Sequence, residues 1–512
     1  MNKCPAVRQI CAAGLVGMGG LFVLPSSALV IDGVQVAAID IPRINAAITL
    51  PGDPTSPLTA GDPPFTTFNI QAFYDTGASG VLVAKETADA IGLPLAAGVE
   101  FGDVGVGGID FFNVSEPINI HLAPFISPFG GGQGIDDPVN FSSTYDQVFT
   151  NLRTQVAQAN SGTFLGGLDV FGMPLFQGKT VTLDPRPLHV GETEFTTSVY
   201  DSGSLPADLP AADLHIQTTY ADFSRFTTTT GGEGPTLNDN PFVGGDPFAL
   251  AGTIPDSQAV VAGYGGSTTA GSWLFDTGAT ASIISEVQAA ALGVTYNEAS
   301  LDTETPFLEG APLADQFTVP IGGVGGTTTV AGFLLDTLTL PTVEGEPITY
   351  NRAPVLVADI ALEDPDTGEQ IILAGILGMN FLLPSFELGS FSAVEGPFDF
   401  LSFDHPSGVL SLTLNPDVVP PLALPGDYNG DGAVNAADYT IWADNFGSMA
   451  NLEADGNGNG VIDAADYTVW ADNFGSTLGP AIGQVQTITN TPEPGTIVVI
   501  CGVGCTLLRR TR

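Results

Sequence analysis

Two short segments of this sequence are nearly the same, and each contains one aspartate. Residues 73–80 read FYDTGASG and residues 274–281 read LFDTGATA, so Asp75 and Asp276 each follow two large apolar residues. A carboxylate in such a position is costly to bury unless hydrogen bonds or a functional partner compensate. The Thr and Gly after each Asp can offer a hydroxyl and backbone N–H groups to it. A pair of compensated, buried carboxylates is therefore the first chemistry to consider.

Two turns of this kind could meet at a pseudo-two-fold axis, where their carboxylates would share one proton. Like charges that close cannot both ionise, so the pair titrates as a unit, with one Asp acting as base and the other as acid. Such a pair can activate a water molecule against a peptide carbonyl without a metal or a covalent intermediate. A single DTGA string is more often an ordinary Asp-containing turn, so the hypothesis depends on the second copy.

The two segments belong to a longer internal repeat. Residues 75–93 and 276–294 align without gaps, and each has Asp-Thr-Gly-Ala, a hydroxyl residue, a short apolar strand and a helix-like stretch. Two further motifs follow in the same order in both copies. The first is GVGG, at 105–108 and 323–326, and the second is a pair of apolar residues followed by Gly-Met, within 170–176 and 376–382. Together with alternating apolar runs that read as strands, this predicts a duplicated, mostly β lobe.

These motifs resemble the aspartic peptidases, in particular the retropepsin-like group with DTGA rather than DTGS. The resemblance covers about residues 30–415 and implies a two-lobed single chain like pepsin that cleaves a peptide or protein substrate. It implies that Asp75 and Asp276 are the catalytic dyad. It also implies supporting residues in the two turns, which are Thr76, Gly77, Thr277 and Gly278. The GVGG segments would be flap tips, because glycine permits a mobile hairpin, and their glycines are Gly105, Gly107, Gly108, Gly323, Gly325 and Gly326.

The sequence departs from the family pattern in several places. Ala78 and Ala279 stand where many pepsins have Ser or Thr, and the flap Tyr of pepsin has no clear counterpart. A lost hydroxyl donor should stabilise the charged carboxylates less, so we expect the dyad to titrate higher than in pepsin, with activity toward mild acid or neutral pH. Long insertions at 122–162 and 220–255 would shape the cleft or block it. No cofactor is expected in this site.

A third region carries two copies of a 12-residue loop, each followed by a near-identical helix-like segment. The loops DYNGDGAVNAAD (427–438) and DGNGNGVIDAAD (455–466) place oxygen ligands at positions 1, 3, 5, 9 and 12, a backbone carbonyl at 7 and Gly at 6. The predicted calcium ligands are Asp427, Asn429, Asp431, Ala433, Asn435 and Asp438 in the first loop, and Asp455, Asn457, Asn459, Val461, Asp463 and Asp466 in the second. We expect two Ca²⁺ ions; a solvated acidic turn is the alternative.

This loop–helix form has Asp rather than Glu at position 12 and no helix before the loop. It resembles the type I dockerin, which implies that exposed helix positions bind a cohesin module on another protein. The repeated Trp442 and Trp470 are expected in the core rather than at that interface. The four histidines are scattered without metal-ligand spacing, and no role is expected for them: His121, His189, His215 and His405.

The charge of the chain is one-sided, with 56 acidic residues against 12 basic ones and a formal charge of −44. This argues against nucleic acid or an anionic membrane as a partner, since both require Lys and Arg. It suits a soluble secreted protein or one that binds cations. The chain has 4 Cys, and all of them lie in the two terminal segments, so the body must hold together without disulfides.

Both ends resemble sorting signals. Lys3 and Arg8 precede an apolar run and a small-residue SSA, which predicts a secretory signal cleaved near Ala28; a retained anchor is the alternative. The last 22 residues combine a PEP, a short apolar run and terminal arginines, and they resemble the PEP-CTERM signal. That resemblance implies a tail that holds the protein at the membrane until an exosortase-type enzyme cuts it. A plain C-terminal anchor is the alternative, although the apolar run is short for one.

The expected architecture is a mostly β, two-lobed body followed by a small α-helical calcium-binding module. Its expected parts are a signal peptide at 1–28, lobes at 30–190 and 255–415 joined by a connection and insertion at 191–254, a Pro-rich linker at 416–426, a dockerin at 427–478 and a sorting signal at 491–512. One function is a secreted aspartic endopeptidase tethered to a surface complex. The alternative is a non-catalytic surface or matrix protein with the same fold. The two differ in whether Asp75 and Asp276 can share one water.

Overall fold

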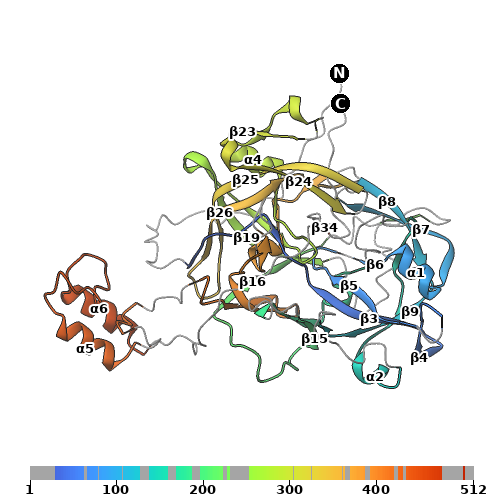
Figure 1. Cartoon of the computed structure of the whole chain (residues 1–512), viewed down its shortest axis with the longest axis horizontal. Helices are drawn as coiled ribbons and strands as arrows, with labels where there is room; N and C mark the ends of the chain where they lie inside the picture. The colour runs from blue at the N-terminus through green and yellow to red at the C-terminus, as the bar shows by residue number, and fades with distance from the viewer. Residues whose placement is uncertain are drawn as a thin grey trace.

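The computed structural model describes most of the body and most of the C-terminal repeat region. The described residues are 29–62, 66–78, 80–105, 108–126, 138–159, 169–186, 196–222, 228–230, 253–301, 303, 305–323, 326–359, 361–363, 370–386, 393–419, 425–429, 434–475 and 500–501. The predicted signal peptide lies outside them, as do Gly107, Gly325, Asp431, Ala433 and nearly all of the predicted sorting signal. The prediction of a mostly β body followed by a small helical module is confirmed (Figure 1).

The first repeat forms an eleven-stranded sheet around the strand that leads to Asp75. Its strands, in spatial order, are β11 (Gln147–Leu152), β9 (Ile118–Ala123), β3 (Arg43–Leu50), β5 (Ile70–Tyr74), β13 (Val170–Phe171), β6 (Val81–Val83), β12 (Gln155–Ala157), β8 (Gly108–Ser115), β7 (Leu95–Gly105) and β18 (Thr228–Thr230), with β4 (Asp53–Pro57) beside β3. Two short helices, α1 (Lys85–Ile91) and α2 (Phe141–Thr144), accompany it. Strands β3 and β9 bury nearly all of their residues, as their Ile, Leu and Ala content requires.

The second repeat forms a ten-stranded sheet with the same local order around Asp276. Its strands are β1 (Leu29–Ile31), β26 (Ile348–Val357), β21 (Ile283–Ile284), β29 (Gly375–Leu377), β20 (Thr268–Phe275), β19 (Thr253–Ala262), β25 (Gly326–Leu340), β24 (Gln316–Gly323) and β34 (Ile500–Cys501), with β17 (Thr219–Asp222) beside β19. Helix α4 (Glu286–Ala291) follows β21. Strand β29 runs parallel to β20 and antiparallel to β21, and β13 has the same relation to β5 and β6. The two copies therefore fold alike where they carry their Asp.

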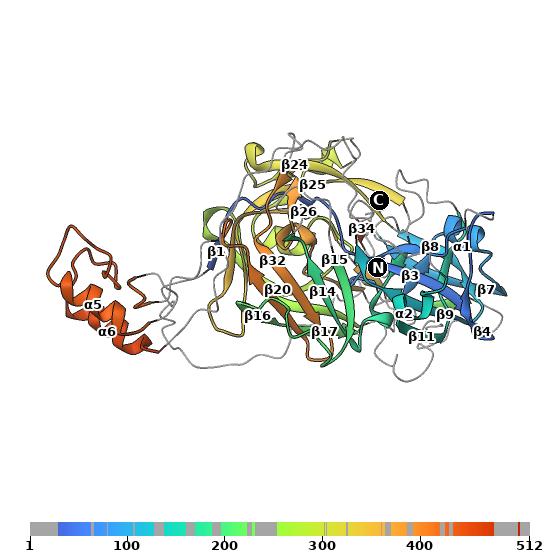
Figure 2. The same ribbon diagram turned by 60° about the horizontal axis from the view of Figure 1, so that its bottom comes forward.

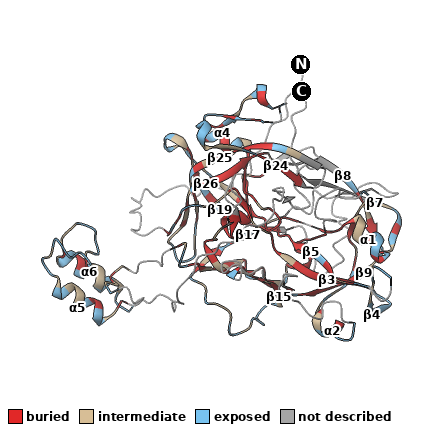
Figure 3. Ribbon diagram, viewed as in Figure 1, coloured by how far each residue is buried: buried red, intermediate tan, exposed pale blue. Residues whose placement is uncertain are grey.

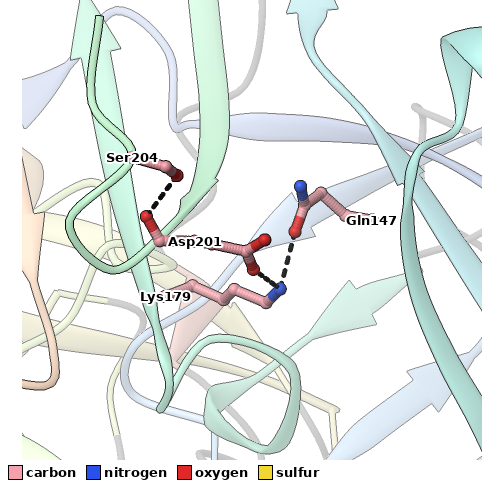
Figure 4. A network of polar contacts seen from close by, with 4 residues as sticks. All are labelled: Gln147, Lys179, Asp201 and Ser204. Atoms are coloured by element: carbon pink, nitrogen blue, oxygen red, sulfur yellow. Dashed lines mark hydrogen bonds and ion pairs between the residues drawn. The ribbon is translucent and has the colours of Figure 1, made fainter.

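A third, six-stranded sheet joins segments from both halves of the chain. It contains β10 (Phe125–Ile126), β15 (Thr196–Asp201), β14 (Lys179–Asp184), β32 (Phe398–Asp404), β33 (Val409–Leu414) and β16 (Leu214–Gln217). Lys179 of β14 connects this sheet to the first one, because its ammonium donates to Gln147 Oε1 of β11 at 2.6 Å and pairs with Asp201 of β15 at 2.5 Å (Figure 4). Ser204 donates to the carbonyl of the same Asp201.

The N-terminal segment crosses to the second repeat. Strand β1 pairs in parallel with β26, and β2 (Ala37–Ala38) pairs with β30 (Ser385–Phe386), which also pairs with β31 (Ala393–Val394). The amide of Ala38 donates to the carbonyl of Thr280, close to the second Asp turn. The predicted bounds of the two lobes stay predictions, but β1 belongs to the second sheet and β2 pairs with β30, a strand of the second half of the chain.

The remaining elements lie at the edges of the body and in the C-terminal region. Two small hairpins pair β22 (Thr295–Tyr296) with β23 (Leu308–Glu309) and β27 (Ala361–Glu363) with β28 (Gln370–Ile372). The C-terminal helices are α5 (Ala436–Asp444) and α6 (Ala464–Asn473), and Figures 1 and 2 both draw them away from the sheets. Figure 3 shows the body strands largely buried, whereas these two helices are mostly exposed or intermediate.

Candidate active site

Each Asp lies in a turn at the end of a buried strand, held by the neighbouring strand of its own sheet. The amide of Asp75 donates to the carbonyl of Phe171 in β13, and the amide of Asp276 donates to that of Leu377 in β29, both at 3.0 Å. Neither Asp is accessible to solvent. The two copies therefore place their carboxyl groups by the same backbone contacts.

The two turns are joined by reciprocal hydrogen bonds between their threonines. The amide of Thr76 donates to Thr277 Oγ1, and the amide of Thr277 donates to Thr76 Oγ1, both at 3.0 Å. Each hydroxyl then donates across to the carbonyl before the opposite Asp, Thr76 to Phe275 and Thr277 to Tyr74, both at 2.6 Å. Four buried hydrogen bonds thus fix the position of one turn against the other.

Gly77 and Gly278 leave room for the carboxyl group of the opposite copy. A Cβ atom on Gly77 would lie 2.6 Å from both carboxylate oxygens of Asp276, and one on Gly278 would lie 2.7 Å from Asp75 Oδ1. Each glycine amide also donates to Oδ1 of the Asp in its own turn, at 2.8 Å for Asp75 and 2.9 Å for Asp276. The turns were predicted to need glycine, and the structure adds the reason: each glycine faces the other carboxyl group.

The two carboxyl groups influence each other's protonation. The pKa of Asp75 is raised well above its ordinary value, first by burial, then by the charge of Asp276 and by a hydrogen bond with its side chain. The amides of Gly77 and Ala78 oppose this shift and lower the pKa, because they donate to the charged form. The two carboxyl groups are therefore close enough to influence each other's protonation, and that they share one proton stays a prediction.

The two Gly-Met segments pack directly against the turns. The amide of Met173 donates to the carbonyl of Ala78 at 2.9 Å, and the amide of Met379 donates to that of Ala279 at 2.8 Å. A side chain on Gly172 would overlap the backbone of Ala78, and one on Gly378 would lie 3.0 Å from the carbonyl oxygen of Ala279. Both alanines are fully buried. These glycines therefore permit the close approach of two backbone segments behind each Asp.

The GVGG segments lie at the ends of two antiparallel hairpins. Gly105 pairs with Gly108 at the end of β7 and β8, and Gly323 pairs with Gly326 at the end of β24 and β25. These are the positions that a hairpin flap requires, but Gly107 and Gly325 lie outside the described residues. Their role as flaps stays a prediction.

His405 contacts the first Asp turn, although the sequence analysis expects no role for it. The residue is buried, and its ring lies 2.7 Å from the hydroxyl of Tyr74, the residue that precedes Asp75. The two are separated by 331 positions in the chain and share no motif, so spacing alone offers no signal for this contact.

The structure describes all residues of the second predicted calcium loop. Asp455 accepts from the amides of Asn459 and Gly460, and Gly460 has φ of +83°, which suits the glycine expected at position 6. Asp466 at position 12 is fully buried and accepts from the amides of Asn457 and Asp463. The loop thus collects carboxylate and amide oxygens around one turn, which are the hard donors that Ca²⁺ prefers.

The first loop repeats this pattern where it is described. Buried Asp438 accepts from the amides of Tyr428, Asn429 and Asn435. Asp427 is described as well, whereas Asp431 and Ala433 are not. Within the described part of the chain, no three His, Cys, Asp or Glu side chains gather so that they could hold a metal, and the predicted ligand sets rely on Asn amides and a carbonyl as well.

Trp442 and Trp470 connect the two loops through a second pair of reciprocal hydrogen bonds. The indole N–H of Trp442 donates to the carbonyl of Asp463 at 2.7 Å, and that of Trp470 donates to the carbonyl of Asn435 at 2.8 Å. The two indoles are half-buried rather than core. With Tyr439, Phe446, Ala464 and Tyr467 they line an open surface pocket of about 560 Å³.

Among the comparisons with known proteins, the most direct support is for the dockerin prediction in the C-terminal region. Residues 425–471 match the family model of the dockerin type I domain, and such domains bind calcium and cohesin modules. No curated protein matches the chain. Among solved structures, the chain is similar to the crystal structure of an aspartic proteinase from Irpex lacteus, with 11% identity and a TM-score of 0.37 over 76% of this chain and 98% of that one. A likeness this distant carries no argument, so the function of the body is inferred from its own geometry.

Proposed function

We propose that the body is an aspartic endopeptidase in which Asp75 and Asp276 activate a water molecule against a peptide bond. The observation that carries the proposal is the reciprocal packing of the two turns, in which each carboxyl group lies against the glycine of the other copy. The threonine exchange supports this, since it fixes the separation of the two carboxyl groups. Thr76, Gly77, Thr277 and Gly278 act as supporting residues, and the two GVGG hairpins close over the substrate.

In this reaction the ionised carboxylate takes a proton from the water as its oxygen attacks the carbonyl carbon. The protonated carboxyl group donates its proton to the carbonyl oxygen, and a tetrahedral diol results. Proton transfer to the amide nitrogen then breaks the C–N bond and releases an amine and a carboxylic acid. One proton shared by the dyad suffices for both steps, which is why a coupled, buried pair is required. The raised pKa of Asp75 favours the form of the pair that keeps this proton.

The C-terminal region attaches the enzyme to an extracellular complex. We propose that each of its two loops binds one Ca²⁺ ion and that the helices bind a cohesin module on another protein, in keeping with the dockerin type I match. The N-terminal signal directs export, and the C-terminal tail holds the protein at the membrane until an exosortase-type enzyme cuts it. In the part of the chain that the structure describes, no helix is long and apolar enough to cross a membrane.

The deciding experiment measures cleavage of a mixed peptide library by the calcium-loaded protein from about pH 3 to about pH 8. Cleavage should be lost in both Asp75→Asn and Asp276→Asn, and pepstatin should block it in the parent. Asp169→Asn is the matched control, because Asp169 is buried in the same lobe but binds Ala84 and Thr87 at the start of α1. A folded parent that cleaves nothing at any pH would favour the non-catalytic scaffold.

A further inference from the structure

The two Asp turns differ in the residue that precedes the Asp. Tyr74 and Phe275 occupy equivalent positions, and the carbonyl of each accepts a hydrogen bond from the threonine of the other copy at 2.6 Å. Both side chains are fully buried. Only Tyr74 carries a hydroxyl group, and a buried hydroxyl without a partner would be costly.

The hydroxyl of Tyr74 belongs to a buried network centred on His405. It lies 2.7 Å from His405 Nε2, and His405 Nδ1 lies 3.2 Å from the hydroxyl of Tyr220 in β17. The Tyr220 hydroxyl also lies 2.9 Å from the carbonyl of His405. The network therefore joins the strand that carries Asp75 to two segments that come much later in the chain.

One arrangement of protons satisfies every group in this network. Tyr74 donates its hydroxyl proton to Nε2, the Nδ1–H of a neutral imidazole donates to the Tyr220 oxygen, and Tyr220 donates to the carbonyl of His405. Burial lowers the pKa of His405 to about 3, opposed only by the nearby charge of Asp404, so the ring stays neutral in mildly acidic solution. The arrangement therefore persists in mildly acidic and neutral solution, where activity is expected.

The backbone of His405 is itself fixed. Its amide donates to the carbonyl of Lys179 in β14, and its carbonyl accepts from Gly408 as well as from Tyr220. The Tyr74 ring packs against Phe176 at a centroid distance of 4.6 Å, and the His405 ring is stacked on Phe403 at 6.1 Å. His405 is thus a rigid acceptor for Tyr74 rather than a side chain that follows it.

We propose that His405 is a positioning residue of the Asp75–Asp276 pair, which it sets by holding Tyr74 and with it the Asp75 turn. The inference rests on the proposed function. The second repeat shows that an Asp turn forms with Phe at this position and the same threonine exchange. The network is therefore not needed to make the turn, and its effect is to anchor one of two otherwise equivalent carboxyl groups to the six-stranded sheet.

Two substitutions at His405 separate the hydrogen bond from the packing. His405→Phe removes the acceptor and should lower kcat about tenfold or more, with KM changed by less than about twofold, because the reacting groups are misplaced while binding contacts remain. His405→Gln offers an amide oxygen near the former Nε2 and should restore most of kcat. Tyr74→Phe should match His405→Phe, and the double variant should lose no more than either single one.

His121→Phe is the matched control. His121 is also buried, and its Nε2 lies 2.9 Å from Thr49 Oγ1 within the first sheet, without contact to either Asp turn. It should lower the melting temperature about as much as His405→Phe and leave kcat unchanged. Equal kcat in His405→Phe and the parent, additive losses in the double variant, or no rescue by Gln would each overturn the positioning role.

A parent without peptidase activity would refute the proposed function but still leave a test of the positioning role. In that case the titration of the dyad is followed by infrared spectroscopy of the carboxyl groups, with Asp75→Asn and Asp276→Asn to identify their bands. His405→Phe should move this titration and His121→Phe should not. If neither variant moves it, His405 supports the fold alone.

Discussion

The body and the C-terminal module each contain two similar copies of one sequence. In both regions, side chains of one copy form hydrogen bonds to the backbone of the other copy. In the body, Thr76 and Thr277 exchange hydrogen bonds in a fully buried site. In the C-terminal module, Trp442 and Trp470 do so at half-buried positions. The body brings its two Asp residues to one site, whereas each loop of the module has its own set of predicted calcium ligands. The shared site has different neighbours in its two halves, such as Tyr74 and Phe275, whereas the helical segments that follow the two separate loops are nearly identical in sequence.

The largest effect should come from filling the space between the two carboxyl groups. Gly77→Ala puts a methyl group where Asp276 lies, so we expect peptidase activity to be abolished and the protein to lose about 1–3 kcal/mol of stability or more. Gly178→Ala is the control, because a Cβ there would meet no atom within 4 Å. Activity and denaturant unfolding of both variants measure the effect. Normal activity in Gly77→Ala would mean that the two carboxyl groups do not lie as described.

Substitutions that break the two sets of reciprocal hydrogen bonds should show how much more stability the buried threonine pair contributes than the half-buried tryptophan pair. Thr76→Val leaves the amide of Thr277 and the carbonyl of Phe275 without their buried partners, which should cost about 2–4 kcal/mol. Thr277→Val should cost the same by symmetry. Trp442→Phe removes one hydrogen bond at a half-buried site and should cost the module about 1 kcal/mol. Equal losses in both regions would show that the buried exchange contributes no more stability than the half-buried one.

Calcium removal should act on the module alone. A ligand at about a thousand times its Kd stabilises the form that binds it by about 4 kcal/mol, so a chelator should unfold α5 and α6 and leave the melting of the body unchanged. Tryptophan fluorescence separates the two events, since Trp273 is buried in the body and the other 2 of the 3 Trp lie in the module. A shift of the body transition on chelation would show that the two regions are coupled.

The smallest effect is a change of stability with pH. Because the pKa of Asp75 is raised, the folded protein holds more protons than the unfolded chain above about pH 4, and stability falls as the pH rises through this window. Asp75→Asn cannot ionise and should melt higher than the parent at neutral pH, by about 2–4 °C for each kcal/mol gained. The gain should shrink toward zero below about pH 4. A gain that does not depend on pH would point to packing instead.

The repeated motifs allowed the meeting of the two turns to be predicted, because duplication fixes which residues must be equivalent. The reason for Gly77 was not accessible in the same way, since its constraint is the carboxyl group of Asp276, about two hundred residues away in the other copy. His405 was missed for a related reason: it belongs to one copy only and follows no motif. The pairing of β1 with the second sheet and of β2 with β30 was also missed, because short apolar strands do not specify their neighbours.

That crossing of the N-terminal segment limits how the protein can be assembled. Asp32 accepts a hydrogen bond from Asn351, which lies 319 residues later, and β1 has no strand beside it until that part of the chain is made. The N-terminal segment therefore cannot complete its strand pairing until β26 has been made, and this closing step must wait for nearly the whole body. Such long-range contacts are slow to form. A protein with this topology should reach its native fold late, only after its last body strands have arrived.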